Sequence, residues 1–272
     1  RFPVAERNAI ESKEKSNASN ELRDITISLI GNSMGGVYGR YAIAKLIERH
    51  CVVEENRENK NSWILNDKYR LYLDTFCTTA APHLGVSRHT WIPVPRIVER
   101  GVAATMGQTG DDLFRLNDLL YTMATDSTFL HPLASFRKRI AYANSYGTDF
   151  PVPVNTAAFL SDKSTYPHHF ESNFKVENEC GLVIATLTTK ANEDGNDENE
   201  PLDDVHQMSV SLDKLGWKKV FVDLQKEMMS ISLPTLGFCS GDSRSGPNRS
   251  LCEWKKGNTV VTSKDVAHMV TE

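Results

Sequence analysis

The sequence lacks the features that would place the protein across a membrane or on a nucleic acid. It has no uninterrupted apolar run of the roughly 18 residues that a membrane-spanning helix needs. Its formal net charge is -4, so it has no excess of positive charge with which to bind a polyanion. It also has no internal repeat. These absences exclude a helical membrane protein and a solenoid, and they leave no support for a nucleic-acid partner.

Cysteine is scarce and irregularly placed. The five cysteines are an odd number without metal-ligand spacing; they are Cys51, Cys77, Cys180, Cys239 and Cys252. This pattern predicts mostly buried or free thiols in a reducing, cytoplasmic compartment, and no metal or other cofactor is expected. In an oxidising compartment, Cys239 and Cys252 could pair instead. The 272 residues, 40% of them apolar and 24% charged, are enough for one globular domain over residues 1–272.

One stretch combines a strand pattern, a glycine-rich turn and a helix pattern. The apolar residues of 25–30 predict a buried strand, and the spacing of Val37, Tyr41 and Ala44 predicts a helix over 34–50. Between them, residues 31–35 read Gly-Asn-Ser-Met-Gly, the G-x-S-x-G pattern of a nucleophile elbow. Gly31 and Gly35 would let the strand and the helix pass closely. A coincidental glycine-rich turn is the alternative, because this short pattern also occurs by chance.

The elbow predicts an α/β-hydrolase fold, with a mostly parallel sheet and helices on both faces. Ser33 would be the nucleophile, and the Met34 N–H, at the positive end of the helix dipole, would be one oxyanion-hole donor. Further strands are expected at 69–78, 139–144, 217–222 and 259–261. We interpret 86–137, which lacks a strand pattern, as a cap over the active site or as a helical crossover. Residues 192–204 are acidic and predict a disordered surface loop rather than a cation site.

A hydrolase of this fold places its acid and then its base after the serine along the chain. Asp149 follows the strand predicted at 139–144 and is the expected acid, with Asp223, at the end of a later strand, as the main rival. Weaker rivals are Asp111, Asp112 and Asp118, because their stretch is expected to be helical and exposed. His268 is the expected base, because it alone among the eight histidines follows the last predicted strand. His168 and His169 are expected in a polar loop.

Several ordered motifs together resemble a lipase-like serine esterase family of the α/β-hydrolase superfamily. The first is the run Gly-x-Ser-x-Gly-Gly-x-Tyr-x-Arg-Tyr-Ala at 31–42, and the second is Thr-Ala-Ala-Pro-His-Leu-Gly at 79–85. Further matches lie at 108–113, 136–144, 152–153, 215–220 and 267–268. The resemblance implies Ser33 as nucleophile, Asp149 as acid and His268 as base. It also implies a lipid or other acyl ester as substrate and contact with a lipid surface.

The chain departs from this family at the elbow and before it. Asn32 stands where the family usually has histidine. No His-Gly pair precedes Ser33, and most of 11–21 is polar, so the early strands and the loop with the second oxyanion donor are expected to be missing. Three functions stay open on the sequence: an esterase or lipase, an acyltransferase with the same triad, and a non-catalytic interaction module.

Overall fold

The computed structural model describes residues 22–53, 62–87, 96–146, 152–171, 183–193, 203–223 and 259–271. Its strands are β1 (Arg23–Asn32), β2 (Cys51–Val53), β3 (Ser62–Leu65), β4 (Tyr69–Thr79), β5 (Lys138–Tyr146), β6 (Pro167–Phe170), β7 (Val183–Thr188), β8 (Lys218–Asp223) and β9 (Val260–Thr262). Its helices are α2 (Met34–His50), α3 (Arg96–Met106), α4 (Gln108–Leu113), α5 (Leu119–Thr125), α6 (Ser127–Ala134), α7 (Val154–Ala157), α8 (Asp204–Asp213) and α11 (Ser263–Thr271).

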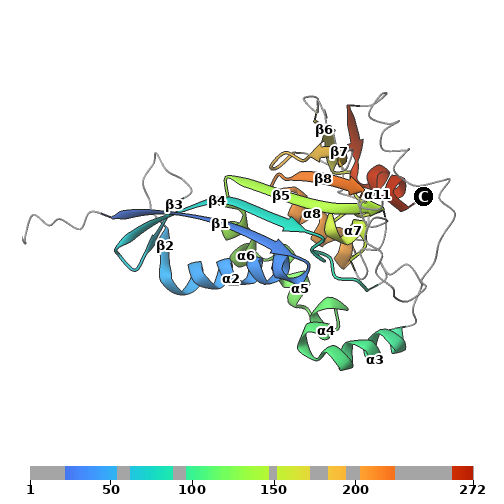
Figure 1. The fold of residues 1–272 in the computed structure, drawn as a ribbon, viewed down its shortest axis with the longest axis horizontal. Helices are drawn as coiled ribbons and strands as arrows, with labels where there is room; N and C mark the ends of the chain where they lie inside the picture. The colour runs from blue at the N-terminus through green and yellow to red at the C-terminus, as the bar shows by residue number, and fades with distance from the viewer. Residues whose placement is uncertain are drawn as a thin grey trace, which may run out of the picture.

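All the described strands belong to one sheet, whose centre is parallel (Figure 1). The order is β2-β3-β4-β5-β8-β7-β6-β9, and β1 pairs with β4. The pairs β1–β4, β4–β5 and β5–β8 are parallel, whereas the remaining pairs are antiparallel. The carboxyl ends of β1, β4, β5 and β8 therefore share one edge of the sheet, which is where α/β proteins place their ligands.

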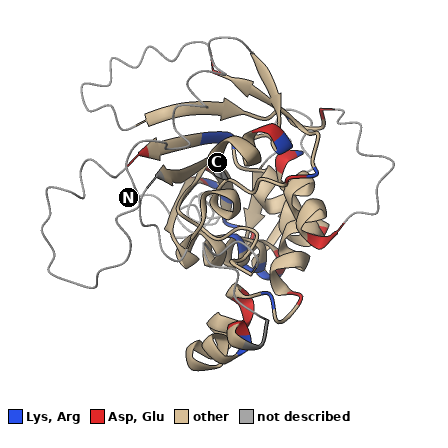
Figure 2. Ribbon diagram, turned by 90° about the vertical axis from the view of Figure 1, so that its right-hand side faces the viewer, with Lys and Arg blue, Asp and Glu red and all other residues tan. Residues whose placement is uncertain are grey.

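The described helices that pack on the sheet lie on one of its faces (Figure 2). A core of buried side chains joins α2, α5, α6 and α8 to the sheet; it includes Val37, Leu73, Phe76, Leu120 and Leu212. Asp126 and Asp203 cap the amino ends of α6 and α8 by accepting backbone N–H bonds. A second helical layer, expected from the sequence on the other face, is not among the described residues.

The local predictions around the elbow are confirmed closely. The strand predicted at 25–30 is β1, and the helix predicted at 34–50 is α2 with the same bounds. The strands predicted at 69–78, 139–144, 217–222 and 259–261 correspond to β4, β5, β8 and β9. One prediction about β1 is wrong: Ile30 is 80% exposed, because only alternate residues of a strand face the core.

The stretch 86–137 contains only helices in its described part, and these fall into two groups. Helices α5 and α6 pack on α8 and α2 and form part of the crossover between β4 and β5. Helices α3 and α4 pack on each other and project from the body of the molecule beside the start of α2 (Figure 1). None of the described helices could cross a membrane. The sequence predicts a cap or a helical crossover here; α5 and α6 belong to the crossover, and the cap stays a prediction.

Candidate active site

Ser33 occupies the turn between β1 and α2, and its backbone is strained. Its φ is 51° and its ψ is -131°, a region that residues other than glycine rarely adopt. The Ser33 amide donates a hydrogen bond to the carbonyl oxygen of Thr79 at the end of β4, over 2.8 Å. The Ser33 side chain makes no capping bond to α2 although it stands at the N-cap position. Its hydroxyl is therefore not used to hold the helix.

Two glycines make the close contact between the strand and the helix. A Cβ at Gly31 would lie 2.5 Å from the backbone of Gly36, and one at Gly36 would lie 2.6 Å from the Ala81 Cβ. Gly35, in contrast, has open space around the position of a Cβ. The close approach was expected at Gly31 and Gly35, with Gly36 adding room. For Gly35 this expectation is wrong, because Gly36 is the residue that faces β4.

The end of β4 and the turn after it hold the elbow in place through hydrogen bonds. Thr79 donates a side-chain hydrogen bond to the Asn32 Oδ1 over 2.8 Å, so the residue that departs from the family pattern links β1 to β4. Ala80, the next residue, also has a positive φ, 47°, and its amide donates to the Tyr142 carbonyl over 3.0 Å. Sequence reasoning did not identify these contacts, because they join residues that are far apart in the chain.

Met34 begins α2 and therefore has an amide N–H without an acceptor inside the helix. This N–H lies at the positive end of the helix dipole, where a developing oxyanion would be stabilised. The Met34 side chain packs against the small apolar cluster that joins α3 and α4, which consists of Val86, Ala103, Leu113 and Phe114. A hydrogen bond of 3.1 Å between the Tyr38 and Thr109 hydroxyls also links α2 to α4. Helices α3 and α4 thus lie directly beside the elbow.

The candidate acids differ in what the structure shows of them. Asp149 lies outside the described residues. Its rival Asp223 ends β8 and pairs with Tyr146 of β5, at the carboxyl edge of the sheet. Asp112 was expected to be exposed, but it is buried and accepts hydrogen bonds from Gln108 and Asn117 over 3.1 and 2.7 Å. The two amide donors satisfy the Asp112 carboxylate, which is a structural role within α4.

His268 lies on the exposed side of α11. Its neighbours Val266, Ala267, Met269 and Val270 are buried in the core around β7 and β8. Helix α11 contacts α7, which packs on β5, and it lies near the ends of β5 and β8 (Figure 1). The helix is therefore at the carboxyl edge of the sheet, as Ser33 is. The described contacts do not include one between His268 and Ser33.

Three other histidines are buried and hold structural hydrogen bonds. His83 and His168 are fully buried, and His206 is 2% exposed. The expectation that His168 and His169 lie in a polar loop is wrong: both belong to β6, and only His169 is partly exposed. The Nδ1 of His168 faces the Tyr166 carbonyl at 3.0 Å. None of the three buried imidazoles is accessible to a substrate.

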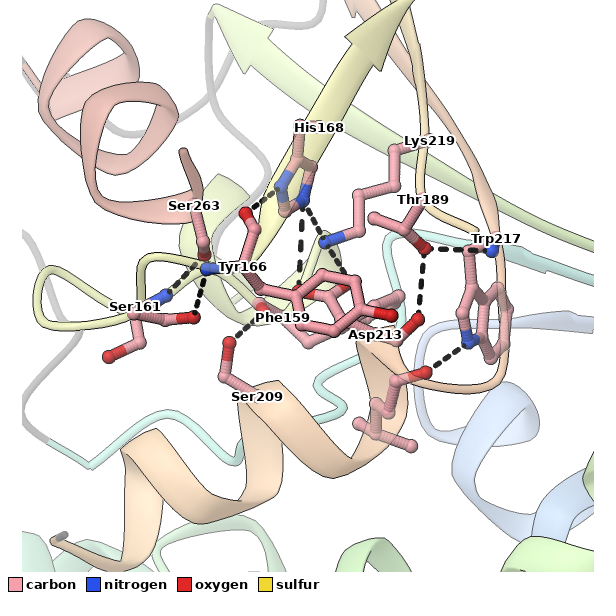
Figure 3. Close-up of polar contacts among 12 residues, drawn as sticks. Phe159, Ser161, Tyr166, His168, Thr189, Ser209, Asp213, Trp217, Lys219 and Ser263 are labelled. Atoms are coloured by element: carbon pink, nitrogen blue, oxygen red, sulfur yellow. Dashed lines mark hydrogen bonds and ion pairs between the residues drawn. The ribbon is translucent and has the colours of Figure 1, made fainter. Parts of the chain in front are cut away.

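A buried ion pair lies beside His168 (Figure 3). The Lys219 ammonium is 2.7 Å from the Asp213 carboxylate and 2.8 Å from the His168 Nε2, and these three side chains are fully buried. Burial raises the pKa of Asp213 to about 6 and lowers that of Lys219 to about 8. Burial and the neighbouring Lys219 hold the pKa of His168 well below its usual value. Lys219 belongs to the amino end of β8, away from the edge that carries Ser33.

Among the residues that the structure describes, neither metal ligands nor reactive thiols add to the site. Within the described ranges, no group of three or more His, Cys, Asp and Glu side chains could hold a metal ion. Cys51 and Cys77 are free cysteines, and burial raises the pKa of both thiols, which disfavours the nucleophilic thiolate. Cys180, Cys239 and Cys252 lie outside the described residues. Of the acidic stretch 192–204, Asp203 and Asp204 begin α8 rather than extend a loop.

A parallel β-strand, a strained serine and an amphipathic helix at the carboxyl edge of a mixed sheet define an α/β-hydrolase. Residues 5–162 match the family described as "Putative serine esterase (DUF676)". The match covers more than half of the chain, and the chain belongs to this family. It includes Ser33 and Asp149 and ends before His268. Searches of curated proteins and of solved structures found no match.

Proposed function

We propose that the protein is a serine esterase that hydrolyses carboxylic esters of lipids, with Ser33 as its nucleophile. The observation that carries the proposal is the backbone of Ser33, which has φ 51° at the junction of β1 and α2. Such a conformation costs about 1–3 kcal/mol and persists where the surrounding structure enforces it. It turns the serine out of the path of both strand and helix, which is what an attacking hydroxyl needs. The strained backbone supports the proposal that Ser33 is the nucleophile.

In the proposed reaction, His268 removes the hydroxyl proton as Ser33 forms a bond to the ester carbonyl carbon. The Met34 N–H binds the resulting oxyanion. His268 then gives the proton to the leaving alcohol, and an acyl group remains on Ser33. Water, deprotonated by the same histidine, releases the acid and restores the serine. Asp149 would hold the His268 tautomer and stabilise its positive charge.

A lipid substrate is supported by the surface of α3. This helix exposes Val98, Val102 and Met106, which are 48%, 44% and 44% accessible and lie on one side at a spacing of four residues. The apolar cluster of α3 and α4 packs on Met34 beside the elbow. This cluster places α3 beside the elbow, so the exposed apolar side of α3 could contact the lipid that carries the ester. An alcohol in place of water would make the same acyl-enzyme an acyltransferase, and product analysis separates the two.

The proposal is tested by covalent labelling with a fluorophosphonate, which reacts with base-activated serines. The wild type and the variants Ser33→Ala and Ser28→Ala are incubated with the probe, and hydrolysis of a p-nitrophenyl ester is measured in parallel. We expect labelling and hydrolysis to vanish in Ser33→Ala and to persist in Ser28→Ala, because Ser28 is exposed on the same strand outside the turn. Equal labelling of the wild type and Ser33→Ala would overturn the assignment.

A further inference from the structure

Arg40 is a buried cation without an acidic partner among the described residues. It lies on α2, about two helical turns after Ser33, and is 1% exposed. Its Nη1 is 3.2 Å from the His83 Nδ1, and its Nη2 donates to the Met123 carbonyl over 2.7 Å. Burial lowers the pKa of Arg40 to about 10, so the guanidinium stays charged at neutral pH. Burying a charge without a counter-ion is costly, which raises the question of what the contact with His83 achieves.

The hydrogen bonds around His83 fix its protonation state. Because a guanidinium can only donate, the His83 Nδ1 must accept from Arg40, and the proton of a neutral ring is on Nε2. The Nε2–H then donates to the Thr78 hydroxyl over 3.0 Å. Burial, followed by the charges of Arg40 and Lys219, holds the pKa of His83 well below its usual value. The ring also packs edge-on against Phe159 and Trp217, with centroids 5.5 and 5.8 Å apart.

His83 belongs to the same segment that supports the nucleophile. Within 78–85, the Thr79 carbonyl accepts the Ser33 amide and the Thr79 hydroxyl donates to Asn32. Thr78 and Ala81 form the surface that Gly36 approaches. The segment is itself strained, since Ala80 has φ 47°. It therefore needs contacts of its own to stay in place, and the bonds of His83 to Thr78 and Arg40 are contacts of this kind.

We infer that Arg40 and His83 are positioning residues that clamp the 78–85 segment to α2 and thereby hold Ser33 in its strained conformation. This inference rests on the proposed function only for its catalytic consequence. The clamp itself concerns the position of the backbone, whatever Ser33 does. Arg40 is on α2, whose N-cap is Ser33, and His83 lies in the segment that follows Thr79, the last residue of β4. The Arg40–His83 contact consequently fixes the distance between the helix that carries the nucleophile and the turn that accepts its amide bond.

The inference is tested with Arg40→Met and His83→Phe, which remove the polar contacts. Methionine keeps an apolar side chain of similar length to that of arginine, and phenylalanine keeps a ring in place of the imidazole. Arg139→Met is the matched control. Arg139 is a partly buried arginine whose guanidinium donates to the carbonyls of Gly216 and Ala134, over 2.9 and 2.8 Å, at the amino end of β5. It is thus comparable in chemistry and is remote from the elbow. Urea unfolding first establishes conditions in which each variant is fully folded.

Two readouts separate positioning from stability. The first is hydrogen exchange of the Ser33 and Ala80 amides, whose bonds to Thr79 and Tyr142 report on the turn directly. The second is the division between kcat and KM for a short soluble ester. We expect Arg40→Met and His83→Phe to lose protection at both amides. We also expect kcat to fall by about tenfold to a hundredfold at nearly unchanged KM, since small displacements of a reacting group have effects of this size. Arg139→Met should keep protection and kcat.

The outcomes distinguish this inference from the proposed function. If the wild type hydrolyses no ester and Ser33 does not react with the probe, the proposed function fails, and the amide exchange still tests the clamp. Unchanged exchange at Ser33 in Arg40→Met, with the protein folded, would overturn the clamp. So would an equal loss of protection or of kcat in Arg139→Met, since that would trace the effect to general destabilisation. A histidine variant that keeps one bond, His83→Gln, should recover part of the protection lost in His83→Phe.

Discussion

The amide of Ser33 and the carbonyl of Thr79 form a hydrogen bond of 2.8 Å across the carboxyl ends of two parallel strands. This bond extends the β1–β4 ladder by one residue, into the turn that carries the nucleophile. It shows how the strained Ser33 conformation is maintained, because the ladder sets the position of the amide while Gly31 and Gly36 let the helix turn back over it. The elbow is thus a property of two strands and one helix together.

The close contact of Gly36 predicts a large difference between two neighbouring glycines. Gly36→Ala should lower the free energy of unfolding by about 1–3 kcal/mol, because its methyl group would overlap Ala81 and Thr78. Gly35→Ala should leave it unchanged or raise it by about 0.5–1 kcal/mol, because alanine is the better helix former and the space is open. Urea unfolding of the two variants checks this. Equal effects would show that the packing at Gly36 is looser than described.

The two candidate acids are separated by a pair of isosteric substitutions. Asp149→Asn should keep the fold and lower kcat by orders of magnitude; the corresponding change in a serine protease triad costs about 10⁴. Asp223→Asn should change kcat little. Steady-state hydrolysis of a soluble ester, with circular dichroism to verify folding, gives the answer. The reverse pattern would assign the acid role to Asp223, which ends β8 opposite Tyr146.

The apolar side of α3 predicts a substrate-dependent effect. The triple variant Val98→Ser, Val102→Ser, Met106→Ser should lower hydrolysis of an ester embedded in phospholipid vesicles by on the order of tenfold, because it removes apolar surface that would contact lipid. Hydrolysis of a water-soluble ester should be unchanged, since these exposed side chains are not part of the buried cluster that Met34 packs against. A parallel loss on both substrates would count against a role in lipid contact.

The buried pair of Lys219 and Asp213 predicts strong coupling. Lys219→Met alone or Asp213→Leu alone should lower the free energy of unfolding by about 3–5 kcal/mol, because each leaves an uncompensated buried group. The double variant should be more stable than the sum of the two losses implies, since an apolar pair needs no counter-charge. A double-mutant cycle from urea unfolding measures the coupling, and strictly additive effects would contradict the ion pair.

The buried histidines predict the sign of the pH dependence. The pKa values of His83 and His168 in the folded state lie well below their usual value, so the unfolded chain binds protons that the folded state does not. The free energy of unfolding should therefore fall as the pH falls below about 6.5. Asp213 opposes this trend, because its raised pKa of about 6 lets the folded state bind a proton between about pH 6 and 4.

This prediction is checked by urea unfolding between about pH 6 and 5. His83→Phe should reduce the slope by one proton, about 1.4 kcal/mol per pH unit, relative to the wild type. A wild-type slope that is the same in His83→Phe would mean that His83 is protonated in the folded state.

The sequence predicted the parts of the fold that are locally encoded. The β1–α2 unit was found because the strand pattern, the glycines and the helical spacing are contiguous. Strand β6 was missed because Pro167, His168 and His169 have no apolar alternation; the buried partners of His168, among them Lys219 and Asp213, are distant in the sequence. The clamp of Arg40 and His83 was missed because its residues are 43 positions apart and neither belongs to a catalytic pattern. Arg40 lies in the first family motif, 31–42, and His83 in the second, 79–85, and this was the one available signal.

The long-range support of Ser33 also has a kinetic consequence. Helix α2 can form from neighbouring residues. The bond between Ser33 and Thr79 requires β1 to pair with β4, and this pairing joins residues far apart in the chain. Asp24 and Arg70, for example, are paired and are 46 positions apart. Parallel pairing of this kind forms slowly compared with a helix. During refolding, helical signal will therefore return before a reactive serine does. A chain in which α2 has formed but β1 and β4 have not paired contains Ser33 without the backbone geometry that would make it a nucleophile.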